Sequence, residues 1–190
     1  MAQGRARHRP SQEARRGGFL KNALNYFGFQ AGWLACVMGA GHGLFWLGPL
    51  AVAALCAAHL HFSADPKREA RRLVAVGVFG LVLESAAQGA GLYAYRGAPA
   101  AWLAPAWIVA LWILLAATFD ASLGWLERRP WLCAVLGAAA SPFSFTAGVR
   151  LGAADLMLPA PAGWFALSAL WFVALPLSFA VAKLAEGRNS

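Results

Sequence analysis

Glu84 and Gln88 are the side chains best placed for chemistry, because they interrupt the otherwise apolar stretch GLVLESAAQGAGLY at residues 80–93. Being four residues apart, they project from one face of a helix. A charged carboxylate at the centre of a membrane costs about 2.5–3.5 kcal/mol on insertion scales, so Glu84 has to be protonated, paired or in contact with water. We therefore predict a polar stripe that faces the inside of a helix bundle, where Glu84 is suited to proton exchange.

Asp120 and His59 are the other two candidate catalytic groups. Each falls near the end of an apolar stretch. For each residue, hydrogen bonding between helices is as well supported as a role in catalysis. The polar neighbours expected for Glu84 are Gln30, His59 and Asp120. Because no basic residue is expected at the depth of Glu84, hydrogen bonding or protonation is favoured there over an ion pair.

The candidate substrate-binding residues are three amides and two tryptophans: Asn25, Gln30, Gln88, Trp33 and Trp112. The alternative for the amides is hydrogen bonding between helices, worth about 0.6 kcal/mol each, and the sequence favours it. The alternative for the tryptophans is bulk packing. The spacing of the amides and of the tryptophans does not by itself show that they bind a ligand.

The composition is that of an integral membrane protein. Hydrophobic residues make up 60% of the chain and charged residues 13%, against about 45–50% and about 25% in soluble domains. Cys36, Cys56 and Cys133 lie in apolar stretches without metal-binding spacing, so we expect neither disulfides nor a metal site. Histidine-rich di-iron, HxxxxD acyltransferase, GxSxG hydrolase and Gly-rich phosphate-loop patterns do not occur, and we expect no cofactor.

The apolar stretches predict an all-α bundle of six transmembrane helices, each run being close to the ~20 residues that a spanning helix needs. The predicted spans are residues 23–41, 44–62, 72–94, 102–126, 131–151 and 163–184. The predicted transmembrane domain covers 22–186. Residues 1–21 form a basic tail with little capacity to fold alone, and 187–190 form a short second tail.

The basic residues predict the orientation of these spans. If the N-terminus is cytoplasmic, fourteen of the sixteen Lys and Arg residues fall in cytoplasmic segments, leaving only Arg96 and Arg150 outside. This asymmetry indicates that both termini are cytoplasmic in a multi-pass protein of the bacterial inner membrane. It also explains the net charge of +8 without nucleic acid, and it favours anionic lipid headgroups as partners.

Several stretches resemble a known family: NYFGFQAGWLACVMGA, HLHF, PAWIVALWILLAATFDASLGWL and LGAAASPFSFTAGVRLGA. Together they resemble an uncharacterised bacterial family of small integral membrane proteins, catalogued as a domain of unknown function, over about residues 22–186. Asp120 replaces an expected Asn, which weakens the case that a charge is required there. The resemblance implies that the gene lies near cyclopropane-fatty-acid-synthase-like genes, and hence a role in membrane lipid metabolism.

The leading hypothesis is a membrane protein of lipid or fatty-acid metabolism with a polar cavity that opens toward the cytoplasmic half. Glu84 would exchange a proton, His59 and Asp120 would assist, and Gln30 and Asn25 would orient a headgroup. The first alternative is a small transporter or flippase in which Glu84 is the coupling carboxylate, and the second is a non-catalytic scaffold or assembly factor. Membrane lipids are the expected partners, and a second copy of the chain or a lipid-modifying enzyme is left open.

Overall fold

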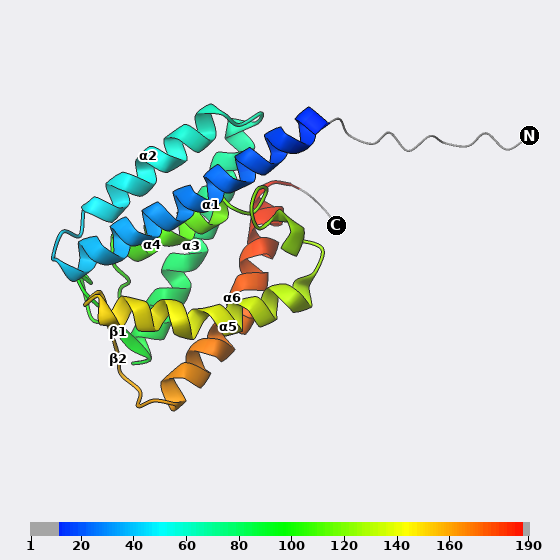
Figure 1. The fold of residues 1–190 in the computed structure, drawn as a ribbon. Coiled ribbons are helices and arrows are strands. Elements are labelled where there is room, and N and C mark those ends of the chain that lie inside the picture. The colour runs from blue at the N-terminus through cyan, green and yellow to red at the C-terminus, as the bar shows by residue number, and fades with distance from the viewer. Residues whose placement is uncertain (1–11, 188–190) are drawn as a thin grey trace, which may run out of the picture.

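The computed structural model describes residues 12–187, and their side chains from Leu20 onward except that of Lys21. The chain forms six α-helices, a short 3-10 helix and one pair of short strands within this range (Figure 1). The helices are α1 (Gln12–Gly41), α2 (Leu47–His61), α3 (Pro66–Gly89), α4 (Ala106–Ala116), α5 (Pro130–Arg150) and α6 (Ala162–Ala185). The predicted helical fold is thus confirmed for the described residues.

The helices differ from the predicted spans in length. Only α5 and α6, with 21 and 24 residues, are long and apolar enough to cross a membrane by length and composition, among the helices that can be described. The predicted span 102–126 is wrong as a continuous helix, because α4 holds only 11 residues and is followed by turns and the 3-10 helix η1 (Gly124–Leu126). Helix α1 begins at Gln12, inside the predicted basic tail, of which residues 1–11 lie outside the described part of the chain.

Side chains supply the hydrogen bonds that end α4 early. The Thr118 hydroxyl donates to the Leu115 carbonyl at 2.6 Å, and the Asn25 amide donates to the Ala117 carbonyl at 2.9 Å. These bonds occupy carbonyl groups that a longer helix would have used, and a hydroxyl competing for its own backbone favours a helix end. The predicted span 102–126 therefore stops being helical where its few polar residues begin.

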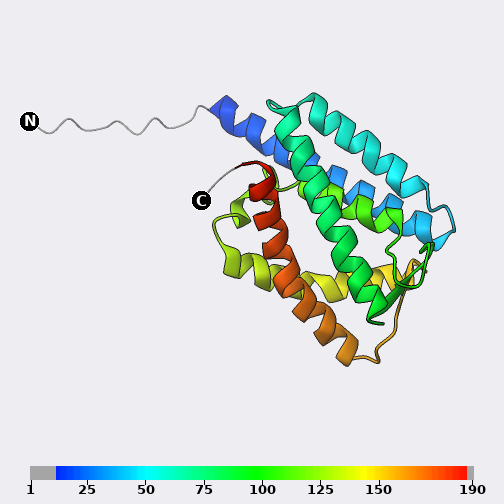
Figure 2. The same ribbon diagram turned by 180° about the vertical axis from the view of Figure 1, so that it is seen from behind.

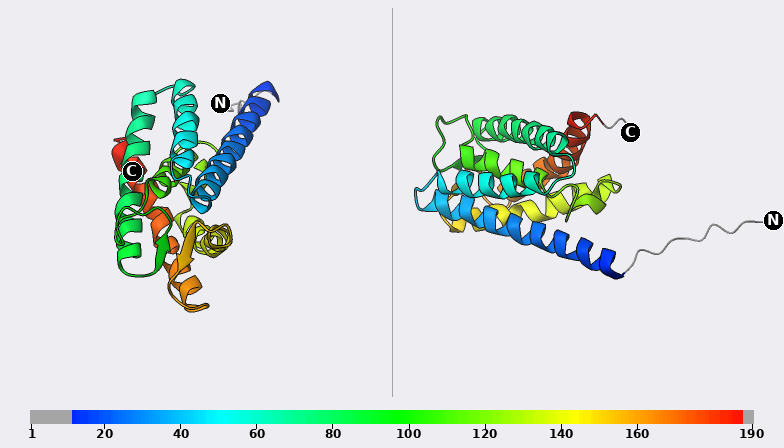
Figure 3. Two further views of the ribbon diagram at one scale, coloured as in Figure 1. Left: turned by 90° about the vertical axis from the view of Figure 1, so that its left-hand side faces the viewer. Right: turned by 90° about the horizontal axis from the view of Figure 1, so that it is seen from above.

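The connections between the helices gather at two opposite ends of the bundle (Figures 1 and 2). The sheet end comprises residues 42–46, 90–105 and 151–161, where β1 (Tyr93–Tyr95) pairs antiparallel with β2 (Ala154–Leu156). The charged end comprises residues 62–65 and 117–129 together with the first turns of α1 and the last turn of α6. Successive helices therefore run in opposite directions between the two ends, as the views in Figure 3 also show.

Helix α3 lies between α4 and α6. Its close contact with α4 depends on a glycine. A Cβ atom added at Gly80 would lie 2.1 Å from Cγ of Trp112, so the indole of α4 packs directly on the α3 backbone. Trp112 in turn stacks on Trp171 of α6, with ring centroids 5.0 Å apart and planes 13° apart. This stack joins three helices at the level of Glu84.

The outer faces of the helices are apolar. Val74, Val78 and Val82 repeat every fourth residue on the exposed side of α3, and Phe143 and Phe165 on α5 and α6 are 79% and 73% exposed. A soluble monomer rarely exposes contiguous apolar patches beyond a few hundred Å². Exposed apolar side chains of this kind are typical of a surface that meets a protein partner or a membrane.

Candidate functional site

Glu84 lies in a buried hydrogen-bonded cluster near the sheet end. Its side chain is 3% exposed, and its Oε2 atom accepts hydrogen bonds from the hydroxyls of Tyr93 and of Tyr95, the latter at 2.7 Å. Its Oε1 atom accepts from the Trp112 indole at 3.0 Å. We call Glu84, Tyr93, Tyr95 and Trp112 the tyrosine cluster. As predicted, Glu84 is hydrogen-bonded and makes no ion pair with a described residue.

The turn after α3 and the short sheet bring the two tyrosines to Glu84. Gly91 has a φ of +75°, a left-handed conformation that glycine adopts without strain, and it reverses the chain toward β1. Residues two apart in a strand share a face, so Tyr93 and Tyr95 point the same way. Pairing of Tyr93 with Leu156 and of Tyr95 with Ala154 fixes the register.

Gln88 organises the backbone around this cluster. Its amide nitrogen donates to the carbonyls of Ala100 and Leu103, at 3.3 and 3.1 Å, and its amide oxygen accepts from the Tyr95 backbone at 3.0 Å. One side chain of α3 thus ties β1 to the connection before α4. Gln88 positions Tyr95 through these bonds.

A hollow of about 340 Å³ borders the tyrosine cluster at the sheet end. Its wall contains Gln88, Tyr93, Tyr95 and Met157, and its remaining lining residues are glycine or alanine. Two of the residues that bond Glu84, Tyr93 and Tyr95, therefore also line a space large enough for part of a ligand. Its position differs from the predicted one, because the hollow lies at the end opposite to the basic residues of α3.

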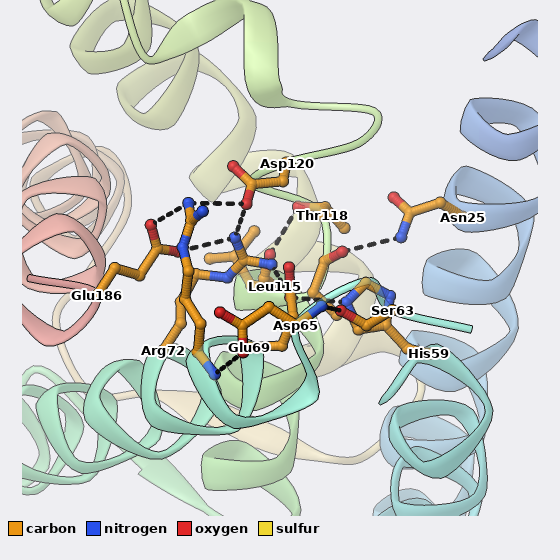
Figure 4. Close-up of polar contacts among 12 residues, drawn as sticks. Asn25, His59, Ser63, Asp65, Glu69, Arg72, Leu115, Thr118, Asp120 and Glu186 are labelled. Carbon is orange, nitrogen blue, oxygen red and sulfur yellow. Dashed lines mark hydrogen bonds and ion pairs between the residues drawn. The ribbon is translucent and has the colours of Figure 1, made fainter. Parts of the chain in front are cut away.

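A second buried polar cluster occupies the charged end (Figure 4). Arg72 of α3 is 1% exposed, and its guanidinium pairs with Glu69, Asp120 and Glu186, the last at 3.0 Å. Arg68 pairs with Glu186 at 2.6 Å, and His59 of α2 lies 2.9 Å from Glu69. We call these residues the charged cluster: His59, Arg68, Glu69, Arg72, Asp120 and Glu186.

The charged cluster is an electrostatic tie between elements distant in sequence. It joins α2, α3, the connection after α4 and the end of α6 through Arg72 and its carboxylates (Figure 4). Burial raises the pKa of Glu69, but the hydrogen bond from His59 and the charge of Arg72 outweigh it, so that pKa is lowered overall. The hollow next to this cluster measures only about 10 Å³. The geometry therefore suits a structural role.

The structure divides the predicted site residues between the two ends. Gln88 and Trp112 lie with Glu84, whereas Asp120 and His59 belong to the charged cluster. Arg72 and Glu84 are separated by twelve residues of α3, about 18 Å at about 1.5 Å per residue. The prediction that His59 and Asp120 are neighbours of Glu84 is therefore wrong.

The three remaining candidates lie on α1 and contact neither the hollow nor Glu84. Asn25 donates to the Ala117 carbonyl and accepts a hydrogen bond from the Ser122 hydroxyl at 2.7 Å, as the alternative of helix–helix bonding predicts. Trp33 is half-buried and packs on the apolar core, which is the alternative named for it. Gln30 is half-buried and makes no side-chain hydrogen bond within the described part of the chain.

Sequence reasoning missed six residues of the two clusters: Tyr93, Tyr95, Arg68, Glu69, Arg72 and Glu186. The tyrosines carry a signal in YAY, where alternation two residues after Gly91 indicates a strand, but residues 72–94 were predicted as one helix. Arg72 stands three residues after Glu69, a spacing that favours an ion pair on one helix face. Glu186 gives no local signal, because its partners lie more than a hundred residues away.

Sequence comparison places most of the chain in a protein family. Residues 22–177 match the model of a family described as "Protein of unknown function (DUF2878)". No curated protein and no solved structure matches the chain. The match brings no reaction, ligand or fold with it, so the two clusters have to be interpreted from their own geometry.

Proposed function

The chain belongs to this family of unknown function, and from its structure we propose a multi-pass membrane protein that binds a lipid at the sheet end. In this proposal the lipid headgroup occupies the hollow beside Tyr93 and Tyr95, and Glu84 exchanges a proton with it through the tyrosine hydroxyls. The single observation that carries the proposal is that both tyrosines bond Glu84 and line the hollow.

The surface supports a membrane location with six passes. The exposed apolar faces run along the helices, and exposed tryptophans occur at both ends: Trp46, Trp102 and Trp164 at the sheet end, and Trp125 and Trp131 at the charged end. Two such belts are typical of residues at the two membrane–water interfaces. The short helix α4 does not conflict with this proposal, because Trp107 and Trp112 are buried and the helix lies inside the bundle.

The basic residues support a cytoplasmic location for the charged end. Lys67, Arg68, Arg71 and Arg72 open α3 there, and Arg128, Arg129 and Lys183 lie at the same end, whereas Arg96 and Arg150 lie at the other. Loops rich in Lys and Arg stay in the cytoplasm. The hollow then faces the outer half of the bacterial inner membrane, with both termini in the cytoplasm.

The chemistry of the tyrosine cluster suits proton transfer to a lipid. A carboxylate that accepts from two phenols can receive a proton through either of them, and each phenolic oxygen keeps the capacity to accept a further hydrogen bond. A positioned acid or base of this kind contributes about 10²–10⁴-fold to a rate. We propose membrane lipid metabolism as the role, because the outer faces of the helices are apolar and the hollow is lined by two tyrosines that bond a buried carboxylate.

A comparative lipidome tests this proposal. Cells would carry the wild-type protein, a deletion, Glu84→Gln or Tyr95→Phe at matched expression, with Tyr26→Phe as the control because Tyr26 is exposed on α1, away from both clusters. We expect the deletion, Glu84→Gln and Tyr95→Phe to change the same lipid species, and Tyr26→Phe to change none. A lipidome that the deletion leaves unaltered would exclude the role.

A transporter or flippase is the second candidate, and one observation favours it. The hollow lies at the sheet end while ion pairs close the charged end, the arrangement expected if access alternates between the two sides. In a variant whose native Cys36, Cys56 and Cys133 are replaced, a single cysteine at Ala94 or at Ala182 would be labelled in upright and in inverted vesicles. Labelling of Ala182→Cys that rises when substrate lipid is added supports transport, and labelling that stays constant argues against it.

A further inference from the structure

The segment WLERRPW, residues 125–131, presents two neighbouring basic side chains on the surface of the charged end. We call it the basic loop. Arg128 and Arg129 are both exposed, and neither makes an ion pair or a side-chain hydrogen bond with another described residue. Each adds a positive charge that no described carboxylate neutralises. Two adjacent guanidinium groups of this kind are available to bind an anion.

The acidic residues of the charged end are directed to other cations. Glu127 precedes the two arginines, but its carboxylate lies 3.4 Å from the Lys183 ammonium and its side chain is only 20% exposed. Asp120 and Glu186 both pair with the buried Arg72. The exposed surface of the basic loop is therefore positive.

Two exposed tryptophans flank the arginines. Trp125 and Trp131 are 51% and 67% exposed. Tryptophan is enriched where lipid headgroups meet the acyl chains, because one part of the indole is apolar and its N–H is polar. The Trp125 indole donates to the Ser122 carbonyl at 3.1 Å, whereas the Trp131 indole makes no hydrogen bond within the described part of the chain. The basic loop thus combines two cations with one unused donor.

Burial and backbone hydrogen bonds hold the basic loop in place. Leu126 is 2% exposed and anchors it in the core. The Arg129 backbone N–H donates to the Leu126 carbonyl at 2.8 Å, and the Glu127 N–H donates to the Gly124 carbonyl at 3.3 Å. Pro130 then opens α5 with a fixed φ. A segment that is already ordered loses less conformational entropy on binding than a flexible one.

We propose that the basic loop binds the phosphate group of an anionic phospholipid in the cytoplasmic leaflet. Arg128 and Arg129 bind the phosphate oxygens, and the Trp131 indole donates to the same headgroup. The exposed tryptophans favour a lipid over a soluble anion, since they lie beside the arginines where a membrane surface would meet them. This site is separate from the hollow at the sheet end, and it shares with the proposed function only the membrane location.

Native mass spectrometry of the purified full chain tests this site by counting the lipid molecules that stay bound. The detergent-solubilised protein would be titrated with dioleoyl phosphatidylglycerol, which is anionic, and with dioleoyl phosphatidylcholine, which has the same chains and no net charge. We expect the first phosphatidylglycerol to bind about thirty-fold more tightly than the first phosphatidylcholine, as expected for two basic residues at an anionic lipid. Equal binding of the two lipids would contradict the proposal.

Two double variants separate a site from total charge. Arg128→Gln with Arg129→Gln is the test, and Lys67→Gln with Arg71→Gln is the matched control. Lys67 and Arg71 are exposed near the start of α3 at the same end, without a described ion-pair partner and without a neighbouring tryptophan. Each double variant loses two unpaired positive charges, so we expect both to fold. The first should lose most of the preference for phosphatidylglycerol, and the control should keep it.

Trp131→Phe tests the indole donor, because phenylalanine keeps an apolar ring and removes the N–H. We expect phosphatidylglycerol to bind several-fold more weakly to this variant and phosphatidylcholine to bind as before; an unchanged affinity would overturn the role given to Trp131. Excess inorganic phosphate should not displace the bound lipid. Displacement by phosphate would show a site for a soluble anion and overturn the assignment to a lipid.

The outcomes also distinguish this site from the proposed function. An equal loss of preference in the two double variants would mean that binding follows total charge, and the proposal would be wrong while the hollow is untouched. Tyr95→Phe should keep the wild-type preference for phosphatidylglycerol, because Tyr95 lies at the opposite end. A lipidome that the deletion leaves unaltered would exclude the proposed metabolic role without removing the lipid bound at the basic loop.

Discussion

The two buried clusters of α3 solve the problem of polarity inside an apolar bundle in different ways. At the charged end, Arg72 is neutralised by carboxylates from three parts of the chain. At the sheet end, Glu84 has no cation among its partners and is held by two phenols and an indole. Full charges joined in pairs lock elements together, whereas a carboxylate held by neutral donors can exchange a proton and respond to a ligand.

The two clusters also differ in how much empty space lies beside them. The charged cluster borders a hollow of about 10 Å³ and the tyrosine cluster one of about 340 Å³. The first end is packed around its polar groups, and the second leaves room beside them. This contrast is the reason for placing stability at the charged end and ligand chemistry at the sheet end.

The largest predicted effect is on stability at the charged end. Arg72→Met leaves Glu69 and Glu186 without their central partner, and breaking a fully buried pair costs about 3–5 kcal/mol. Because Asp120 is partly exposed and Arg68 still contacts Glu186, we expect a loss of about 2–4 kcal/mol. Thermal unfolding in detergent micelles measures it.

Arg71→Met is the matched control for this substitution. Arg71 precedes Arg72 on α3 and is exposed, so the same change of residue removes the same charge without a buried partner. We expect its unfolding temperature to stay close to the wild-type value. Equal losses in the two variants would contradict a specific role for the buried guanidinium.

The next effect tests the packing that holds Trp112 against Glu84. Gly80→Ala places a Cβ atom 2.1 Å from Trp112 Cγ, so the indole has to move, at a cost of about 1–3 kcal/mol. Gly148→Ala on α5 is the control, since a Cβ atom there meets nothing within 4 Å. We expect Gly80→Ala to lower the unfolding temperature and shift tryptophan fluorescence; a neutral Gly80→Ala would show that this contact is loose.

A smaller stability effect is expected at the tyrosine cluster. Tyr95→Phe removes one hydrogen bond to Glu84, which typically contributes about 0.5–1.5 kcal/mol, while Tyr26→Phe on the exposed face of α1 should change nothing. Chemical unfolding in mixed micelles compares the two. A loss for Tyr95→Phe as large as that for Arg72→Met would abolish the distinction between the ends.

The smallest effect is a pH dependence confined to the charged end. The pKa of Glu69 is lowered from its ordinary value of 4.5, so its contribution to stability is fully present above about 4.5 and is lost as the pH falls through the lower folded value. We expect Glu69→Gln to flatten the decline of the unfolding temperature below pH 4.5. An unchanged acid profile would mean that Glu69 does not stabilise the fold through its charge.

The sequence predicted the helices better than the site. Hydrophobic runs gave the approximate position of every helix, and the glutamate in an apolar stretch correctly indicated a buried polar position. The tyrosine partners of Glu84 were missed because the predicted span 72–94 ended inside YAY; three residues carry too short an alternation to compete with a long apolar run. Arg72 was counted only as a basic residue of a cytoplasmic segment, because its burial depends on Asp120 and Glu186, which only the tertiary fold brings near.

The division of roles between the two ends is tested most directly by Tyr95→Phe, measured for stability and for ligand binding on the same purified sample. Unfolding temperature and crosslinking of a photo-reactive lipid analogue to residues of the hollow would be recorded beside those of Tyr26→Phe. We predict that Tyr95→Phe keeps an unfolding temperature within a few degrees of wild type and loses most of the crosslinking. Normal crosslinking with a marked loss of stability would contradict it, and would make the tyrosine cluster a structural element like the charged one.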